Sequence, residues 1–200
     1  MTPEIRIGSG QFKGQRISSR GAGYRPTSGI VKKSLFDILA DDLDESRFLD
    51  LFAGSGAVGV EALSRGAKYV CFVECNASRV NVIKKNIEKM GIAKEFVEVL
   101  QMDYALALEL LRKRKASFDL IYVDPPYGEL EPARILGDIA TSRVLSEDGA
   151  VIFESTKRDV RKIIESIPES LYPFRERALG STALIFLRWR GDHSGANIES

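Results

Sequence analysis

Two short motifs carry residues whose types and spacing are suited to chemistry, and the first is rich in glycine. Gly54, Gly56 and Gly59 form a G-x-G-x-x-G pattern, and Glu74 stands 20 positions after Gly54. Glycine permits a tight turn and lets a ligand lie against bare backbone. An acidic side chain at this spacing can accept hydrogen bonds from two ribose hydroxyls. Together the motif and Glu74 predict a site for an adenosine-containing cofactor.

Acidic residues before and after the glycine motif help to distinguish which adenosine-containing cofactor the site binds. A dinucleotide needs surroundings that favour its negative pyrophosphate, whereas S-adenosylmethionine carries a positive ammonium and a positive sulfonium. The Asp50 carboxylate, just before the motif, can receive the ammonium and would repel a pyrophosphate. Asp103 follows the third predicted strand, where it can accept the adenine amino group or cap the next helix. Both roles of Asp103 stay open.

The second motif is Asp124-Pro125-Pro126-Tyr127. The prolines fix the backbone and remove two N–H donors, which leaves the Asp124 carboxylate and the Pro125 carbonyl as acceptors. Two acceptors can hold both protons of a planar exocyclic amine and aim its lone pair at a methyl group, while Tyr127 stacks on the base. Catalysis would then depend mainly on orientation and on stabilising positive charge at nitrogen. This chemistry favours methyl transfer over hydride transfer.

The elements that must position these motifs follow a strand–helix alternation. We expect strands at residues 47–52, 69–74, 96–101, 118–123 and 150–154, and helices at 57–65, 77–90, 104–115, 130–141 and 158–167. Such alternation predicts a Rossmann-like α/β fold with a mostly parallel, doubly wound sheet. Segments 172–179 and 182–189 predict a C-terminal antiparallel hairpin. Both motifs then lie at the carboxyl end of the sheet, where open α/β sheets bind ligands.

The first 35 residues differ from the rest in charge. They carry seven basic side chains against one acidic, a balance of +6, so the total of +1 leaves −5 for residues 36–200. Apolar residues among glycines predict a small hairpin here, followed by an amphipathic helix at 28–39. We expect the basic side chains to contact RNA phosphates, unless they form an ordinary solvated face. These residues are Arg6, Lys13, Arg16, Arg20, Arg25, Lys32 and Lys33.

Length and composition limit the remaining possibilities. The 200 residues, 44% of them hydrophobic, are enough for one core. We divide the chain into a basic hairpin appendage (1–27), a catalytic domain (28–190) and a disordered tail (191–200). A single histidine, His193, argues against a metal site, and Cys71 and Cys75 fit a reduced protein. We therefore expect a cytoplasmic protein with no membrane span and no metal.

The chain resembles the bacterial small-subunit ribosomal RNA guanine-N2 methyltransferases of the RsmD type, which are class I enzymes dependent on S-adenosylmethionine. The likeness runs in family order over roughly residues 5–190. The Asp-Pro-Pro-Tyr motif alone is shared with other amine methyltransferases, so the arginine-rich front is more discriminating. The matching stretches are residues 6–14, 25–27, 49–65, 72–74, 84–86 and 123–127.

This resemblance implies methyl transfer to the N2 amine of a guanine in 16S rRNA, within the small ribosomal subunit or an assembly intermediate. We expect the protein to act as a monomer. It implies that the target guanine is held by Asp124, Pro125 and Tyr127. It places the cofactor, S-adenosylmethionine, against Asp50, Phe52, Gly54, Ser55, Gly56, Glu74, Cys75, Asp103 and Tyr104. Among these, Asp50 and the glycines would line the methionine end, Glu74 the ribose and Asp103 the adenine.

One departure from the family pattern follows Arg25-Pro26-Thr27. The family usually continues with a polar, charge-rich helix start, whereas this chain continues with Ser28-Gly29-Ile30. The departure leaves the catalytic assignment intact and puts the RNA contacts in question. Two alternatives stay open: an amine methyltransferase with another target, such as adenine N6 or a glutamine amide, and a non-catalytic RNA-binding or assembly factor. Glutamine enzymes usually carry Asn in place of Asp124, which disfavours that target.

Overall fold

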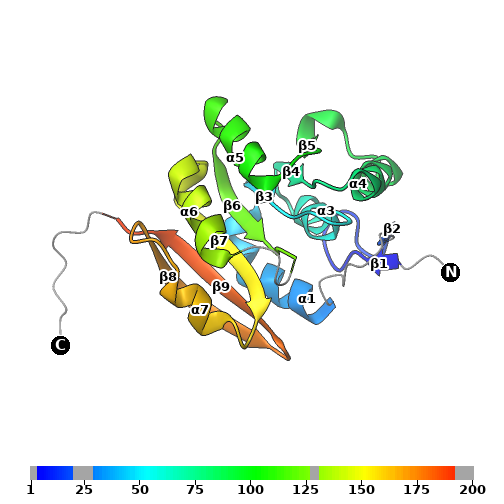
Figure 1. Ribbon diagram of the computed structural model, residues 1–200. Coiled ribbons are helices and arrows are strands. Elements are labelled where there is room, and N and C mark those ends of the chain that lie inside the picture. Colours follow the sequence, from blue (N-terminus) through cyan, green and yellow to red (C-terminus); the bar gives the residue numbers. More distant parts are fainter. Residues whose placement is uncertain (1–3, 20–28, 127–130, 192–200) are drawn as a thin grey trace.

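The predicted α/β architecture is confirmed by the computed structural model, which describes residues 4–19, 29–126 and 131–191 (Figure 1). A seven-stranded sheet has the order β5-β4-β3-β6-β7-β9-β8, in which β3 to β7 run parallel. The direction of winding reverses between β3 and β6, and this is the switch point of the sheet. The strands are β3 (Arg47–Asp50), β4 (Tyr69–Val73), β5 (Val97–Leu100), β6 (Phe118–Val123), β7 (Leu145–Thr156), β8 (Leu171–Leu179) and β9 (Thr182–Trp189).

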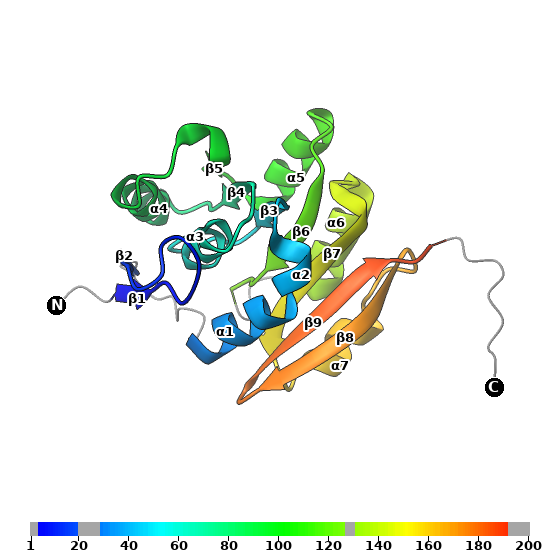
Figure 2. The same ribbon diagram turned by 180° about the vertical axis from the view of Figure 1, so that it is seen from behind.

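Helices cover both faces of the sheet (Figures 1 and 2). Successive side chains of each strand point to opposite faces, so a strand that is apolar throughout needs a covering layer on each side. Phe48 and Tyr122 belong to one hydrophobic core, and Leu49 and Ile121 belong to the other. The first core is closed by α1 (Gly29–Ile38), α2 (Ala40–Leu43), α3 (Ala57–Ser64) and α4 (Ala77–Lys89). The second is closed by α5 (Tyr104–Lys113), α6 (Pro132–Ser142) and α7 (Val160–Glu165). None of the described helices is long and apolar enough to cross a membrane.

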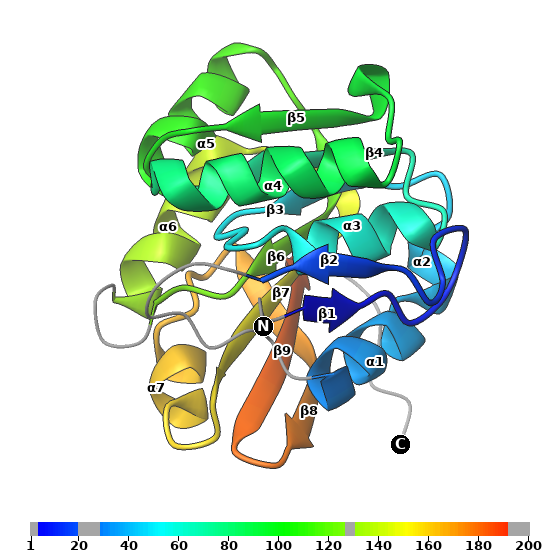
Figure 3. The ribbon, with the colours of Figure 1, turned by 90° about the vertical axis from the view of Figure 1, so that its right-hand side faces the viewer.

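The predicted N-terminal hairpin forms from β1 (Glu4–Arg6) and β2 (Arg16–Ser18), which pair antiparallel. It lies against α3 and α4, with α1 on its other side (Figure 3). Ile7, Phe12 and Ile17 are buried in the same core as α1 and α3. The hairpin therefore shares the main core. The division at residue 27 stays a prediction, because residues 20–28 lie outside the described part of the chain, as do residues 192–200.

The C-terminal hairpin joins the sheet as predicted, with β9 antiparallel to β7 and β8 antiparallel to β9. Strand β7 is longer than the predicted 150–154, because it starts at Leu145 and runs through the polar residues 146–148. Its pairing with β6 shifts register between Phe118 and Leu120, and Ser146 donates a hydrogen bond to Asp119. This irregularity lets a segment of turn-like composition continue the strand. Helix α2 and the 3-10 helix η1 (Lys94–Phe96) were not predicted.

A substitution at Gly59 tests how closely α3 packs on the sheet. A Cβ added there would overlap the Phe72 ring and lie 2.8 Å from Cγ1 of Val70. We expect Gly59→Ala to lower the free energy of unfolding by about 1–3 kcal/mol, as overpacking of a core does. Urea denaturation measures this. Gly137→Ala is the matched control, because a Cβ there meets nothing within 4 Å and should raise stability by about 0.5–1 kcal/mol. Equal stabilities of the two variants would contradict the close packing.

Candidate active site

Four acidic side chains lie at the carboxyl ends of four adjacent strands. Asp50 ends β3, Glu74 follows β4, Asp124 follows β6 and Glu154 lies near the end of β7. All four residues are buried, with exposed fractions between 1% and 6%. We call them the acidic row. Because β3 and β6 flank the switch point, the acidic row occupies the place where this kind of sheet binds its ligand.

The glycine turn is held between two members of the acidic row. Gly54 N–H donates to Glu74 Oε2 at 3.0 Å, and Gly59 N–H donates to Asp50 Oδ2 at 3.2 Å. Gly54 and Gly56 have φ angles of +56° and +77°, in the left-handed region that favours glycine. The backbone of the turn therefore approaches the row without side chains in between. The other oxygen of Glu74 accepts the Asn76 N–H at 2.8 Å, so this carboxylate also fixes the start of α4.

Burial and repulsion between neighbouring carboxylates make Asp50 and Glu154 reluctant to carry negative charge. Burial raises the pKa of Asp50 to about 7, and the charges of Asp124 and Glu74 add to this, against the hydrogen bond from Gly59. Burial and the charge of Asp124 also raise the pKa of Glu154 to about 8, against the hydrogen bond from Tyr122. A positive ligand group beside the row would relieve this repulsion, whereas a phosphate would increase it. The site therefore favours a cationic ligand.

The remaining residues predicted to bind cofactor lie around the glycine turn and the end of β5. The Ser55 carbonyl accepts a hydrogen bond at 2.9 Å from Asn86. The ring of Phe52 lies 5.3 Å from that of Tyr104, whose hydroxyl donates to Asp138. Cys75 is exposed, with its thiol 3.7 Å from a Glu74 oxygen.

Two roles are predicted for Asp103, and the structure tests the one as a helix N-cap. Asp103 Oδ1 accepts the Ala105 N–H at 2.8 Å, which confirms its role as the N-cap of α5. Its side chain also stands at the carboxyl end of β5, next in the sheet to β4 and Glu74. Contact with adenine stays a prediction.

The Asp-Pro-Pro motif begins directly after β6, and Tyr127 lies outside the described residues. Pro125 and Pro126 are half-buried and help to line a pocket beside Asp124. Glu154 also lines this pocket, and nothing in the sequence pattern pointed to it. The only sequence signal for Glu154 is that it is a carboxylate in the apolar run of residues 150–154. Within the described residues, no histidine, cysteine, aspartate and glutamate side chains form a group of three or more that could hold a metal ion.

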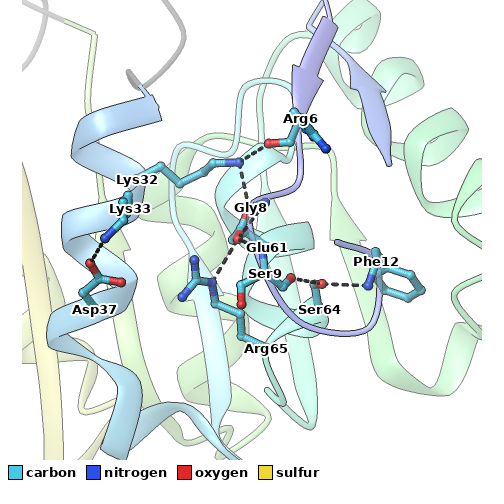
Figure 4. Close-up of polar contacts among 10 residues, drawn as sticks. All are labelled: Arg6, Gly8, Ser9, Phe12, Lys32, Lys33, Asp37, Glu61, Ser64 and Arg65. Carbon is cyan, nitrogen blue, oxygen red and sulfur yellow. Dashed lines mark hydrogen bonds and ion pairs between the residues drawn. The ribbon is translucent and has the colours of Figure 1, made fainter. Parts of the chain in front are cut away.

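The structure separates the basic residues of the front into two kinds. Arg6, Lys13 and Arg16 are exposed on the hairpin, where Arg16 lies 3.6 Å from Glu4, and Lys33 is exposed and paired with Asp37. Lys32 is 5% exposed, and its ammonium lies 2.8 Å from a carboxylate oxygen of Glu61 (Figure 4). We therefore leave Lys32 out of the proposed RNA contacts, because it neutralises a buried carboxylate. Arg20 and Arg25 lie outside the described residues.

The doubly wound sheet with a glycine turn at its switch point defines a Rossmann-like class I methyltransferase fold. A solved methylase shares the fold: the ribosomal protein L11 methylase of Lactobacillus delbrueckii subsp. bulgaricus is 18% identical, with a TM-score of 0.65 over 88% of this chain and 95% of that one. At this identity the likeness shows the fold alone.

The chain belongs to the family described as "Conserved hypothetical protein 95", whose model matches residues 5–188. YlbH of Bacillus subtilis is 34% identical over 188 residues, which cover 94% of this chain and 100% of YlbH. The resemblance to the RsmD type is confirmed by ribosomal RNA small subunit methyltransferase D of Haemophilus influenzae, 32% identical over 88% of this chain and 90% of that protein. A solved protein of Thermus thermophilus is 26% identical, with a TM-score of 0.77 over 92% of this chain and 99% of that one.

Asp50→Asn tests the electrostatics of the acidic row. A carboxyl with a pKa near 7 in the folded protein and near 4 in the unfolded chain binds its proton more tightly when folded. Rising pH between these values therefore favours unfolding. Relative to Asp50→Asn, the wild type should lose up to about 2 kcal/mol of unfolding free energy between pH 5 and pH 7. Denaturant titrations at pH 5, 6 and 7 measure this, and a pH-independent difference would contradict the raised pKa.

Proposed function

We propose that this protein transfers a methyl group from S-adenosylmethionine to the exocyclic N2 amine of a guanine in 16S rRNA of the small ribosomal subunit. The acidic row at the switch point carries this proposal, because it favours a cofactor with a positive ammonium and sulfonium. The name of the Haemophilus influenzae relative supports small-subunit rRNA as the substrate. We further propose that the protein acts as a cytoplasmic monomer on assembling or assembled subunits.

The residues around the glycine turn fit the parts of this cofactor. S-adenosylmethionine supplies a methyl group on positively charged sulfur. The Asp50 carboxylate would receive the ammonium, and ionisation of Asp50 is favoured once that charge is in place. Glu74 Oε2 accepts only the Gly54 N–H among the contacts of the described residues and keeps capacity to accept a ribose hydroxyl. Oε1 accepts the Asn76 N–H and lies 3.7 Å from both the Cys75 thiol and the Arg79 guanidinium. The exposed backbone of the turn would lie along the methionine end.

The Asp-Pro-Pro segment would position the amine. Asp124 and the Pro125 carbonyl would each accept one N–H of the guanine amine, which aims the nitrogen lone pair at the methyl carbon. The methyl carbon would pass to nitrogen as its bond to sulfur breaks, which leaves sulfur as a neutral thioether. The nitrogen would gain positive charge, the Asp124 carboxylate would stabilise it, and the proton would then pass to this carboxylate. Glu154 lines the pocket beside Asp124 together with Lys162, whose ammonium pairs with Glu131 at 2.9 Å. Tyr127 is proposed to stack on the base.

Methyl transfer followed by nucleoside analysis tests the proposal. The protein is incubated with isotopically labelled S-adenosylmethionine and small subunits from a bacterial strain that lacks the homologous enzyme. The rRNA is then digested and the nucleosides are identified by mass spectrometry. We expect labelled N2-methylguanosine from 16S rRNA. Labelled N6-methyladenosine would contradict the substrate, and the absence of any label in RNA would contradict the activity.

Asp124→Ala should separate catalysis from cofactor binding. Removing the acceptor should abolish methyl transfer, because the amine is then neither oriented nor stabilised, yet leave the cofactor Kd within about twofold, as expected for an interaction made mainly in the transition state. Transfer assays and calorimetry measure the two effects. Asp148→Ala, an exposed carboxylate in the polar stretch of β7, is the control and should keep full activity. Loss of cofactor binding in Asp124→Ala would show that its assigned role is wrong.

The exposed basic side chains of the hairpin should bind RNA phosphates. Deletion of the hairpin would also remove Ile7 and Ile17 from the core, so charge substitution is the cleaner test. Replacing Arg6, Lys13 and Arg16 with Gln should weaken RNA binding and lower the slope of log K against log salt by up to about 2, at roughly 0.7 per lost phosphate contact. Filter binding at several salt concentrations measures this.

The control replaces three exposed basic residues on and just after α5, namely Arg112, Lys113 and Lys115, with Gln. These lie at the amino end of β6, away from the acidic row, so the salt dependence should stay that of the wild type. Equal slopes in the hairpin variant and the wild type would contradict RNA binding by the hairpin.

A further inference from the structure

Asn86 belongs to the Lys84-Lys85-Asn86 stretch, and neither the proposed cofactor contacts nor the proposed amine contacts use its side chain. It lies on α4, is 1% exposed, and makes three hydrogen bonds of 2.9 Å. Its Oδ1 accepts the Ser18 N–H, and its Nδ2 donates to the carbonyls of Ser18 and Ser55. Ser18 ends strand β2 of the hairpin, and Ser55 stands inside the glycine turn. One side chain therefore joins the hairpin to the cofactor turn.

The hairpin is also fixed to α3, the helix that begins at the glycine turn (Figure 4). Glu61 on α3 is fully buried and accepts backbone hydrogen bonds from Gly8 and Ser9 at 2.9–3.1 Å. Lys32 and Arg65 pair with the same carboxylate at 2.8 and 2.9 Å. Burial alone would raise the pKa of Glu61, but the hydrogen bonds from Lys32, Gly8 and Arg65 hold it below its ordinary value. A buried carboxylate satisfied in this way fixes its partners in place.

Ser64 adds a second contact on the same helix. Its hydroxyl donates to the Ser9 carbonyl at 2.5 Å and accepts the Phe12 N–H at 2.9 Å. A Cβ on Gly10 would overlap the Ser64 carbonyl, so the loop between β1 and β2 lies directly on the helix backbone. The hairpin is consequently attached to α3 and α4 by several contacts, and its exposed cations are carried on the same helices that flank the glycine turn.

The hydrogen bond from Asn86 to Ser55 restrains the glycine turn at its most flexible position. The neighbours of Ser55, Gly54 and Gly56, both have positive φ, and glycine leaves the chain free to adopt many other conformations. The Asn86 amide fixes the Ser55 carbonyl and thereby the Ser55–Gly56 peptide. Whatever stabilises Ser18 against Asn86 also stabilises the turn in the conformation that would receive the cofactor.

We propose that Asn86 is a positioning residue that couples the RNA-binding hairpin to the cofactor turn, so that RNA and cofactor each strengthen the binding of the other. This inference rests on the proposed function. Coupling between two sites is reciprocal, and typical couplings change affinity by about 5–150-fold. Restraint of the turn by one ligand lowers the entropic cost of ordering it for the other.

The coupling is measured with S-adenosylhomocysteine, which binds without reacting. Its Kd is determined by calorimetry with the protein alone and by equilibrium dialysis and calorimetry with saturating small subunits that lack the modification. For the wild type we expect subunits to lower the Kd at least about fivefold. For Asn86→Ala we expect the ratio of the two Kd values to fall to within twofold of one. Asn81→Ala, an exposed asparagine on the same helix, should keep the wild-type ratio.

Asn86→Asp supplies a second variant in case the alanine variant does not fold. It keeps the acceptor for Ser18 but replaces the donor that holds Ser18 and Ser55, so it should also lose the coupling. A merely structural role for Asn86 would weaken both Kd values equally and leave the ratio unchanged, which would overturn the proposal.

A wild-type ratio of one would also overturn it, even without any variant. Failure of the wild type to bind S-adenosylhomocysteine at all would instead contradict the proposed function. Binding without coupling leaves that function standing, so the two failures are distinguishable.

Discussion

The structure depends most on the burial of like charges at the carboxyl edge of the sheet. Strands β4, β3, β6 and β7 lie side by side, and each brings one carboxylate to the same edge. The burial of Asp50 beside Asp124 and Glu74 disfavours its charged form and raises its pKa. The backbone N–H groups of the glycine turn offset part of this cost, and a cationic ligand would offset more. The acidic row thus links the stability of the fold to what the site binds.

The second organising feature is the buried ion pair between Lys32 and Glu61. It shows that the basic residues at the front of the chain are not all available to bind RNA. The front of the chain is basic, yet Lys32 turns inward to Glu61 and joins the hairpin to the helix behind the glycine turn. The exposed cations that remain, such as Arg6 and Arg16, are carried on a hairpin that shares the main core. A surface that we propose to bind RNA is therefore built on the same helices that shape the cofactor turn.

The sequence was sufficient to predict the fold and most of the acidic row. Strand–helix alternation determines which strand ends share an edge, so Asp50, Glu74 and Asp124 could be placed together before the structure was known. Glu154 was missed because a single carboxylate in an apolar strand has no motif, and its role depends on its neighbour in the sheet. The burial of Lys32 was missed because charge counts do not show which face of an amphipathic helix a long side chain follows. The extent of β7 was underestimated because residues 146–148 have the composition of a turn.

The acidic row should select a positively charged methyl donor over a dinucleotide that has the same adenosine half. Calorimetric titration of the wild-type protein with S-adenosylmethionine and, separately, with NAD at pH 7.5 tests it most directly. Both ligands offer a ribose to Glu74, but they differ in the sign of the charge they bring to Asp50. We expect binding of S-adenosylmethionine and no measurable binding of NAD. Equal or tighter binding of NAD would contradict it.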